Sequence, residues 1–152
     1  MKLAEALQER ADINIRLSQL RERMVCNALV QEGESTAEDP GELLREFDEC
    51  VTRLEYLMNR INLTNCATIV NGKTLTELIA HRDCLKERVN TLRRVLGEAS
   101  QPTKRVMRSE IKILSAIDVR EQQKLIDNYS KELRFTDNLI QSVNWTTDLI
   151  EN

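Results

Sequence analysis

The fold is decided by the stretch from Leu75 to Ala99, which reads LTELIAHRDCLKERVNTLRRVLGEA. Its aliphatic side chains recur every three or four residues, the spacing of one face of an amphipathic helix. This apolar face consists of Leu75, Leu78, Leu85, Val89, Leu92 and Leu96. At position 82, where the spacing calls for another apolar residue, the chain has Arg82. The pattern therefore predicts a long helix with one charged residue in its packing face.

Arg82 has two interpretations. In the first, its aliphatic stem lies along the core and its guanidinium reaches solvent. In the second, Arg82 is a paired arginine that fixes the register of the helices against an acidic residue on a neighbouring helix.

The rest of the chain predicts three further amphipathic helices. The first runs from Leu3 to about Gln31. The second starts at Pro40, because Asp39 is a favourable N-cap residue and proline suits the first helical turn, and it is expected to end near Leu63. Asp118 caps the last helix. The expected apolar faces are Leu3, Leu7, Ile13, Leu17, Leu20, Met24 and Ala28; Phe47, Val51, Leu54, Met58 and Ile61; and Val119, Ile126, Tyr129, Leu133, Ile140 and Val143.

Two segments favour β structure. The pair Asn71-Gly72 predicts a tight turn flanked by two or three paired residues. Residues 106–117 contain Met107, Ile111, Ile113 and Ile117 at alternating positions with charged residues between them, which is typical of a half-buried strand. Such a strand needs a partner for its backbone groups, either the segment Thr68–Val70 or the same strand in a second copy of the chain.

The predicted fold class is all-α, with one short β segment near 106–117. The 152 residues include only 3% aromatic side chains, four glycines and two prolines, which suits aliphatic helix packing. Short connections make neighbouring helices antiparallel, as long helical hairpins or a four-helix coiled-coil bundle, and we expect a single helical domain over 1–152. Because long helices bury less surface than a compact globule, we expect a homo-oligomer. A different protein partner is the alternative.

The expected location is the cytoplasm. Residues Met1 to Glu5 show no apolar run of a secretory signal, and no stretch approaches 18 apolar residues, so no membrane contact is expected. Four cysteines lie far apart in sequence and form no paired motif. We therefore expect reduced thiols that act as small apolar core residues.

Catalytic motifs are not found in the sequence. It has no glycine-rich phosphate loop, no nucleophile elbow and no zinc-binding helix. His81 is the single histidine; it lies off the apolar face and is interpreted as a surface residue, and a di-metal helical site needs two histidines. No catalytic residue, metal or cofactor is therefore predicted, and the chain is not expected to be an enzyme. Nucleic acid is excluded as a partner because no aromatic residue interleaves the basic ones and the isoelectric point is near 5.4.

The charges are unevenly distributed. Residues 32–49 contain eight acids and one base, and residues 82–112 contain nine bases and four acids. The acidic and basic stretches are either solvent-exposed helix surfaces or complementary ends through which two subunits bind each other. A further alternative is an enzyme or ligand-binding protein whose site forms between subunits, where charged groups converge at one end of the bundle. The residues of this possible site are Arg82, Asp83, Arg108, Glu110 and Lys112.

Several short motifs taken together resemble a family of bacterial proteins labelled septicolysin, whose function is not established. The resemblance covers essentially the whole chain. It rests on residues 1–7, 27–28, 30–34, 38–40, 60–65, 72–77, 82–83, 108–112 and 144–149. It implies a bacterial helical protein and supplies no catalytic or cofactor residue. The label suggests a membrane-active cytolysin, which is an alternative function.

Complementary charged ends make a testable prediction. If acidic and basic ends of different subunits meet, raising the salt concentration from about 0.05 M to about 0.5 M will screen the attraction and lower the oligomer's mass. Light scattering after size exclusion measures that mass. A mass that does not change with salt would contradict this contact.

Overall fold

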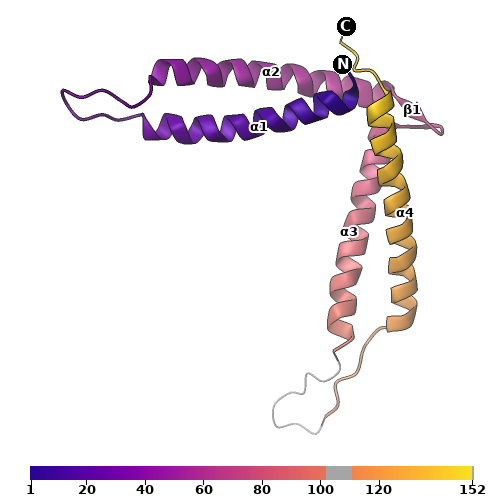
Figure 1. The fold of residues 1–152 in the computed structure, drawn as a ribbon. Helices are drawn as coiled ribbons and strands as arrows, with labels where there is room; N and C mark the ends of the chain where they lie inside the picture. Colours follow the sequence, from indigo (N-terminus) through magenta and orange to yellow (C-terminus); the bar gives the residue numbers. More distant parts are fainter. Residues whose placement is uncertain (102–110, 152) are drawn as a thin grey trace. The chain divides into compact units, whose positions relative to one another are not determined.

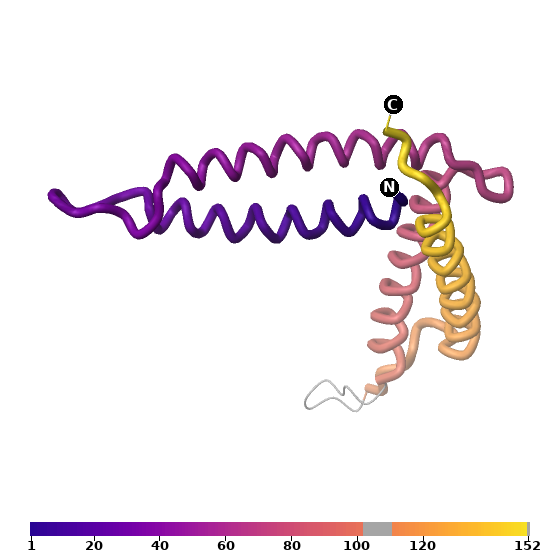
Figure 2. Tube along the Cα trace, turned by 45° about the horizontal axis from the view of Figure 1, so that its top comes forward, coloured from indigo at the N-terminus to yellow at the C-terminus, as the bar shows by residue number. Residues whose placement is uncertain are grey.

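The computed structural model describes residues 1–101 and 111–151. The described residues form helices α1 (Leu3–Cys26), α2 (Pro40–Ala67), α3 (Leu75–Ala99) and α4 (Val119–Thr146), and strands β1 (Ile69–Val70) and β2 (Lys73–Thr74). Helices α1 and α2 lie side by side and antiparallel, as do α3 and α4 (Figures 1 and 2). The predicted all-α class with a short β segment is confirmed.

The chain divides into two compact units. The first unit comprises residues 1–74 and 143–152, and the second unit comprises residues 75–142. Each unit is organised around one antiparallel helical hairpin, one of the two architectures that the sequence predicts. The single domain expected over 1–152 stays a prediction.

The helix boundaries confirm the predicted starts and correct two ends. The Asp39 side chain accepts a hydrogen bond from the Gly41 N–H (2.8 Å), and α2 begins at Pro40. Asp118 accepts from the Glu121 N–H (3.0 Å), directly before α4. Helix α2 does not end near Leu63 but continues to Ala67, because the Thr68 N–H still donates to the carbonyl of Thr64 (2.9 Å).

Helix α1 ends at Cys26, five residues before the predicted end, because Asn27 closes it. The Asn27 side-chain amide donates to the carbonyl of Arg23 (2.9 Å), and its oxygen accepts the Glu38 N–H (3.0 Å). Arg23 in turn binds the Glu38 carboxylate through Nε and Nη2. A side chain that hydrogen-bonds backbone groups competes with helix continuation, so these contacts fix both ends of the α1–α2 loop.

The predicted tight turn is confirmed. Ile69 pairs with Thr74 and Val70 with Lys73 in antiparallel register. Asn71 and Gly72 both have positive φ, at 51° and 81°, as a two-residue hairpin turn with matching twist requires.

The strand expected near 106–117 is not found in the part that the structure describes. Residues 111–117 form no strand, and 106–110 lie outside the described residues. The segment considered as a partner within the chain is already occupied, because Ile69–Val70 pairs with Lys73–Thr74. The β segment of the fold is therefore at residues 69–74.

The core of the second unit follows the predicted face of α3. Its buried apolar side chains are Leu75, Leu78, Leu85, Val89 and Leu96 from α3, and Ile126 and Ile140 from α4. At the edges of this core, Arg88 lies over the Tyr129 ring with its guanidinium carbon 5.5 Å from the ring centre. The predicted faces of α3 and α4 are thus the ones that pack.

The first unit joins the start of the chain to its last residues. The Leu3 N–H donates to the carbonyl of Thr147, and the Leu149 N–H donates to the carbonyl of Met1, both at 2.9 Å. Lys2 Nζ lies 2.8 Å from a carboxylate oxygen of Asp148. Residues 147–150, called the closing segment below, thereby tie the beginning of α1 to the end of α4.

Thr64 anchors the closing segment to α2. Its side chain is fully buried. The Thr64 hydroxyl donates to the carbonyl of Arg60 (2.8 Å) and accepts the Ile150 N–H (3.0 Å). One hydroxyl therefore satisfies a backbone donor that would otherwise be left without a partner.

Replacing Thr64 by valine should destabilise the protein by about 1–3 kcal/mol, since the Ile150 N–H loses its buried acceptor. Urea unfolding followed by circular dichroism measures the change. The matched control is Thr52→Val, because the exposed Thr52 hydroxyl makes the same type of bond, to the carbonyl of Asp48 (2.9 Å), and accepts nothing from another segment. The control should change stability by less than about 0.5 kcal/mol. Equal losses in both variants would contradict the anchoring role.

Candidate interaction surface

Helix α2 has a wider apolar face than one neighbouring helix can cover. Its apolar residues fall into three adjacent rows at heptad spacing. The first row is Leu43, Cys50 and Leu57, continued by the polar Thr64; the second is Phe47, Leu54 and Ile61; the third is Leu44, Val51 and Met58. The first two rows are buried or half-buried and form the α2 side of the hairpin.

The third row is exposed to solvent. Leu44, Val51 and Met58 expose 51%, 39% and 48% of their surface. The sequence predicts Val51 and Met58 as packing residues, and for the single chain this is wrong: the buried apolar side chains of α2 are Leu43, Leu57 and Ile61. We call Leu44, Val51 and Met58 the exposed row. Acidic residues lie beside it, since Asp48 and Glu55 follow Leu44 and Val51 by four residues, and both are exposed.

Three ion pairs fix the register of α1 against residues 38–53, two of them with α2 itself and one with Glu38 in the loop before it. Their α1 members, Glu9, Arg16 and Arg23, are spaced by seven residues. Their partners are Arg53, Glu46 and Glu38, in reverse chain order as antiparallel helices require. The Arg53–Glu9 pair is bidentate, with distances of 2.6 and 2.9 Å. Heptad-spaced ion pairs flanking an apolar seam specify one alignment of two helices, so the exposed row has a defined place in the first unit.

These pairs change the acidity of their carboxylates. Hydrogen bonds from Arg53 hold the pKa of Glu9 below its ordinary value, and hydrogen bonds from Arg23 do the same for the pKa of Glu38. The hydrogen bond from Lys2 lowers the pKa of Asp148 in the closing segment. In each case the charged form is favoured because the donor carries a positive charge.

A lowered pKa in the folded state makes stability depend on pH. The stabilisation is complete above the unfolded-state pKa, which is about 4.3 for glutamate, and it is lost as the pH falls through the lower folded-state pKa. We therefore expect the melting temperature to fall between about pH 7 and about pH 3, and Glu38→Gln to lose less over this interval than the unmodified protein. Thermal unfolding at both pH values measures the difference. Glu32→Gln, which changes an exposed loop residue, should retain the full loss. A pH dependence in Glu38→Gln as steep as that of the unmodified protein would contradict the role of this pair.

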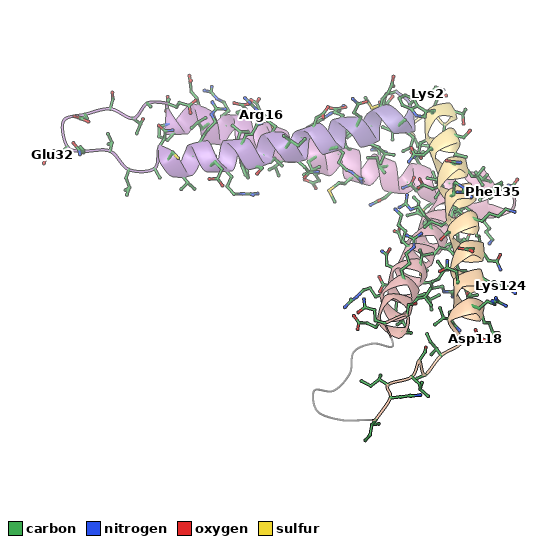
Figure 3. The ribbon with its side chains drawn as sticks, turned by 60° about the horizontal axis from the view of Figure 1, so that its bottom comes forward. Lys2, Arg16, Glu32, Asp118, Lys124 and Phe135 are labelled. Carbon is green, nitrogen blue, oxygen red and sulfur yellow. The ribbon has the colours of Figure 1, made fainter. Side chains whose placement is uncertain are left out.

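The loop between α1 and α2 presents a second exposed apolar group. Leu29 exposes 91% of its surface and Val30 follows it. Glu32 lies at the tip of this loop (Figure 3). The acidic stretch predicted from the sequence thus begins directly after these apolar residues, and two of its acids, Glu38 and Glu46, are paired with arginines of α1.

The residues predicted to form a site between subunits are separated along the second unit. Arg82 and Asp83 lie in the second turn of α3 and pair with each other, with Arg82 Nε 2.9 Å from the Asp83 carboxylate. Lys112 is exposed and follows the opposite end of α3. Arg108 and Glu110 lie outside the described residues. Within one chain, therefore, the described members of this group do not converge.

Arg82 agrees in part with both interpretations of the sequence: its side chain is mostly buried along the helix, and its guanidinium pairs with acidic residues. Only 20% of its side chain is exposed, and its second contact is Asp137 on α4, at 3.7 Å. The preceding residue, His81, has its Nε2 2.8 Å from Glu132 Oε1, also on α4. Both side chains thus connect α3 to α4, and His81 is a partly exposed residue, as predicted.

The cysteines differ from their prediction as core residues. Cys26, Cys66 and Cys84 are exposed and Cys50 is half-buried. Cysteine is small enough to occupy either side of a helix, so composition alone does not decide its burial. Among the described residues, no cluster of three or more histidine, cysteine or acidic side chains could hold a metal ion, and no helix is long and apolar enough to cross a membrane.

The fold and surface define an all-helical protein built from antiparallel helical hairpins. The chain belongs to the family described as "Family of unknown function (DUF6847)", whose model matches residues 10–149. It is similar to a crystal structure of "a functionally unknown conserved protein from Corynebacterium diphtheriae", with 38% identity over 99% of both chains and a TM-score of 0.93. No curated protein matches the chain.

Proposed function

We propose that the chain is a non-enzymatic structural or adaptor protein of the cytoplasm that assembles into a homo-oligomer through coiled-coil contacts. The observation that carries this proposal is the exposed row of α2. Three large apolar side chains at heptad spacing, on a helix whose other apolar rows are already packed, match one side of a coiled-coil seam.

The exposed row suits a second copy of the same chain. In a twofold contact centred on Val51, the two α2 helices run antiparallel, and Leu44 of one copy meets Met58 of the other. Burying apolar area of this kind is the main driving force for association. The heptad-spaced ion pairs between α1 and α2 support the proposal because they hold the hairpin in one alignment, so the row is presented without further ordering.

The acidic residues beside the exposed row give this contact a distinctive salt dependence. In the twofold arrangement, Asp48 of one copy lies near Glu55 of the other, so like charges repel. Salt screens that repulsion and should strengthen the assembly. A contact between acidic and basic ends, which the sequence suggests, would be weakened by salt. The sign of the salt effect therefore separates the two interfaces.

The expected solution mass is a multiple of 17.6 kDa. Val51→Glu should reduce the mass to that of a single chain, because it places a charge at the centre of the apolar contact. Light scattering after size exclusion measures both proteins, and circular dichroism checks that the variant remains helical.

The matched control is Ile15→Glu. Ile15 is a large aliphatic residue on α1 that exposes 59% of its surface and lies outside the exposed row. This variant should keep the mass of the unmodified protein. A protein that is monomeric at all concentrations, or an assembly unaffected by Val51→Glu, would overturn the proposal.

The sequence alternatives have less support. The site between subunits would require Arg82 and Asp83 to leave the pairs they make within the second unit. The cytolysin function suggested by the septicolysin resemblance stays a prediction.

A further inference from the structure

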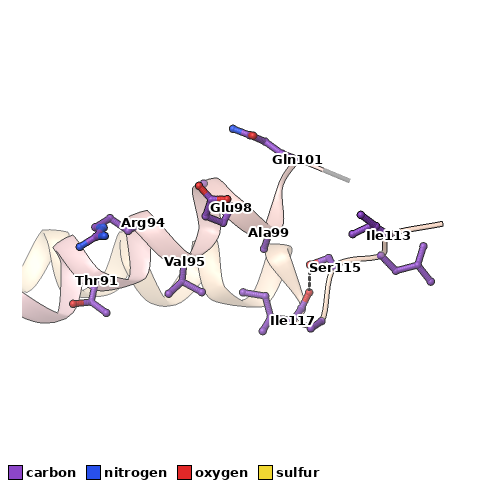
Figure 4. A pocket seen from close by; sticks show the side chains of 12 residues that line it. Thr91, Arg94, Val95, Glu98, Ala99, Gln101, Ile113, Ser115 and Ile117 are labelled. Atoms are coloured by element: carbon purple, nitrogen blue, oxygen red, sulfur yellow. Dashed lines mark hydrogen bonds between the residues drawn. The ribbon is translucent and has the colours of Figure 1, made fainter. Parts of the chain in front are cut away.

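The second unit contains a pocket of about 750 Å³. It lies where the last turns of α3 face residues 113–117, the segment that leads into α4 (Figure 4). Its apolar walls are formed by Val95, Ala99, Ile113, Leu114, Ala116 and Ile117. The volume is within the range of pockets that bind small organic molecules, and such pockets are mostly apolar with a few polar groups that orient the ligand.

The polar groups lie along the outer turns of α3. Thr91, Arg94 and Glu98 contribute to the lining from this helix. Glu98 already interacts with another group of the protein. Arg94 makes no ion pair with any residue in the described ranges, 1–101 and 111–151. The pocket therefore offers a guanidinium group beside an aliphatic cavity.

The wall formed by residues 113–117 is held by a local contact. The Ser115 hydroxyl donates to the carbonyl of Ile117 (2.9 Å), shown as a dashed line in Figure 4. This bond satisfies the Ser115 donor within the segment. Ile117 is half-buried and Leu114 is largely exposed. An aliphatic ligand would cover apolar surface that is now in contact with water.

We propose that this pocket binds an amphipathic organic anion with an unbranched aliphatic body and one carboxylate, such as a fatty acid. The aliphatic body lies between Val95 and Ala99 of α3 and Ile113 and Ile117 of the opposite wall. The carboxylate binds Arg94, whose planar guanidinium can donate two parallel hydrogen bonds to its oxygens.

This inference does not depend on the proposed function. The pocket is in the second unit, whereas the exposed row is on α2 of the first unit. Binding and assembly can therefore be measured separately, and the failure of one leaves the other standing.

The direct test is a fluorescence titration of the full chain with 11-(dansylamino)undecanoic acid, an aliphatic carboxylate whose emission rises when water is excluded. We expect saturable binding of one probe per chain. Laurate should displace the probe, whereas dodecyltrimethylammonium, which has the same alkyl length and the opposite charge, should not. The absence of saturable binding, or equal displacement by both competitors, would overturn the proposal.

Two variants locate the ligand. Arg94→Gln should weaken probe binding at least about tenfold, because the carboxylate loses its counter-ion. Ala99→Trp should also weaken it, because the indole takes up part of the space for the aliphatic body. The matched control is Lys86→Gln, which removes an exposed cation of α3 that does not line the pocket, and it should bind the probe like the unmodified protein. Equal weakening by Arg94→Gln and Lys86→Gln would also overturn the proposal, since it would indicate a general effect of charge.

Discussion

The structure of the first unit depends on a difference in width between the apolar faces of its two helices: the face of α2 is wider than that of α1. Helix α1 buries one narrow set of residues, including Leu17 and Leu20, whereas α2 carries three adjacent apolar rows. A helix can cover only the part of its neighbour that faces it, so one row of α2 must stay in solvent while the chain is alone. The ion pairs along the seam decide which row that is, since they fix the rotation and register of α2 relative to α1. The alignment of α1 with α2 therefore determines both which residues pack inside the hairpin and which apolar row remains on its surface.

Local chemistry explains why parts of this fold are predictable from the sequence. The start of α2 follows from Asp39 and Pro40, and the turn at residues 69–74 follows from Asn71-Gly72, because each involves bonds or torsion angles within a few residues. The packing face of α3 is also predictable, since its aliphatic side chains form one stripe and no competing face exists. The spacing of the aliphatic residues also shows that Arg82 lies within that stripe. Its contact with Asp137 cannot be predicted from the sequence, because it depends on the position of α4 beside α3.

The errors arise where several apolar faces compete or where tertiary contacts override a local preference. On α2 the sequence offers two equally regular seams, and the choice between them depends on the position of α1. The later end of α2 follows from the bond between the Thr68 N–H and the Thr64 carbonyl, and the Thr64 side chain is held by Ile150 from far along the chain. The alternation of residues 111–117 has the period of a strand, but a strand also needs a partner, and the nearby candidate is paired elsewhere. The pocket could not be foreseen, because its walls are brought together only by the return of the chain after α3.

The closing segment has a consequence for how the chain is made. The first unit is discontinuous in sequence: residues 75–142, which form the second unit, are synthesised between its two parts. On the ribosome, α1 and α2 can pair early, but the hydrogen bonds of Leu3 and Thr64 to the closing segment have to wait until residues 147–150 have been added. All of residues 75–142 are synthesised before the closing segment, so the contacts that complete the first unit depend on residues added after the whole second unit. Slow translation of the last turns of α4 would prolong the interval in which Thr64 and its apolar surroundings remain uncovered.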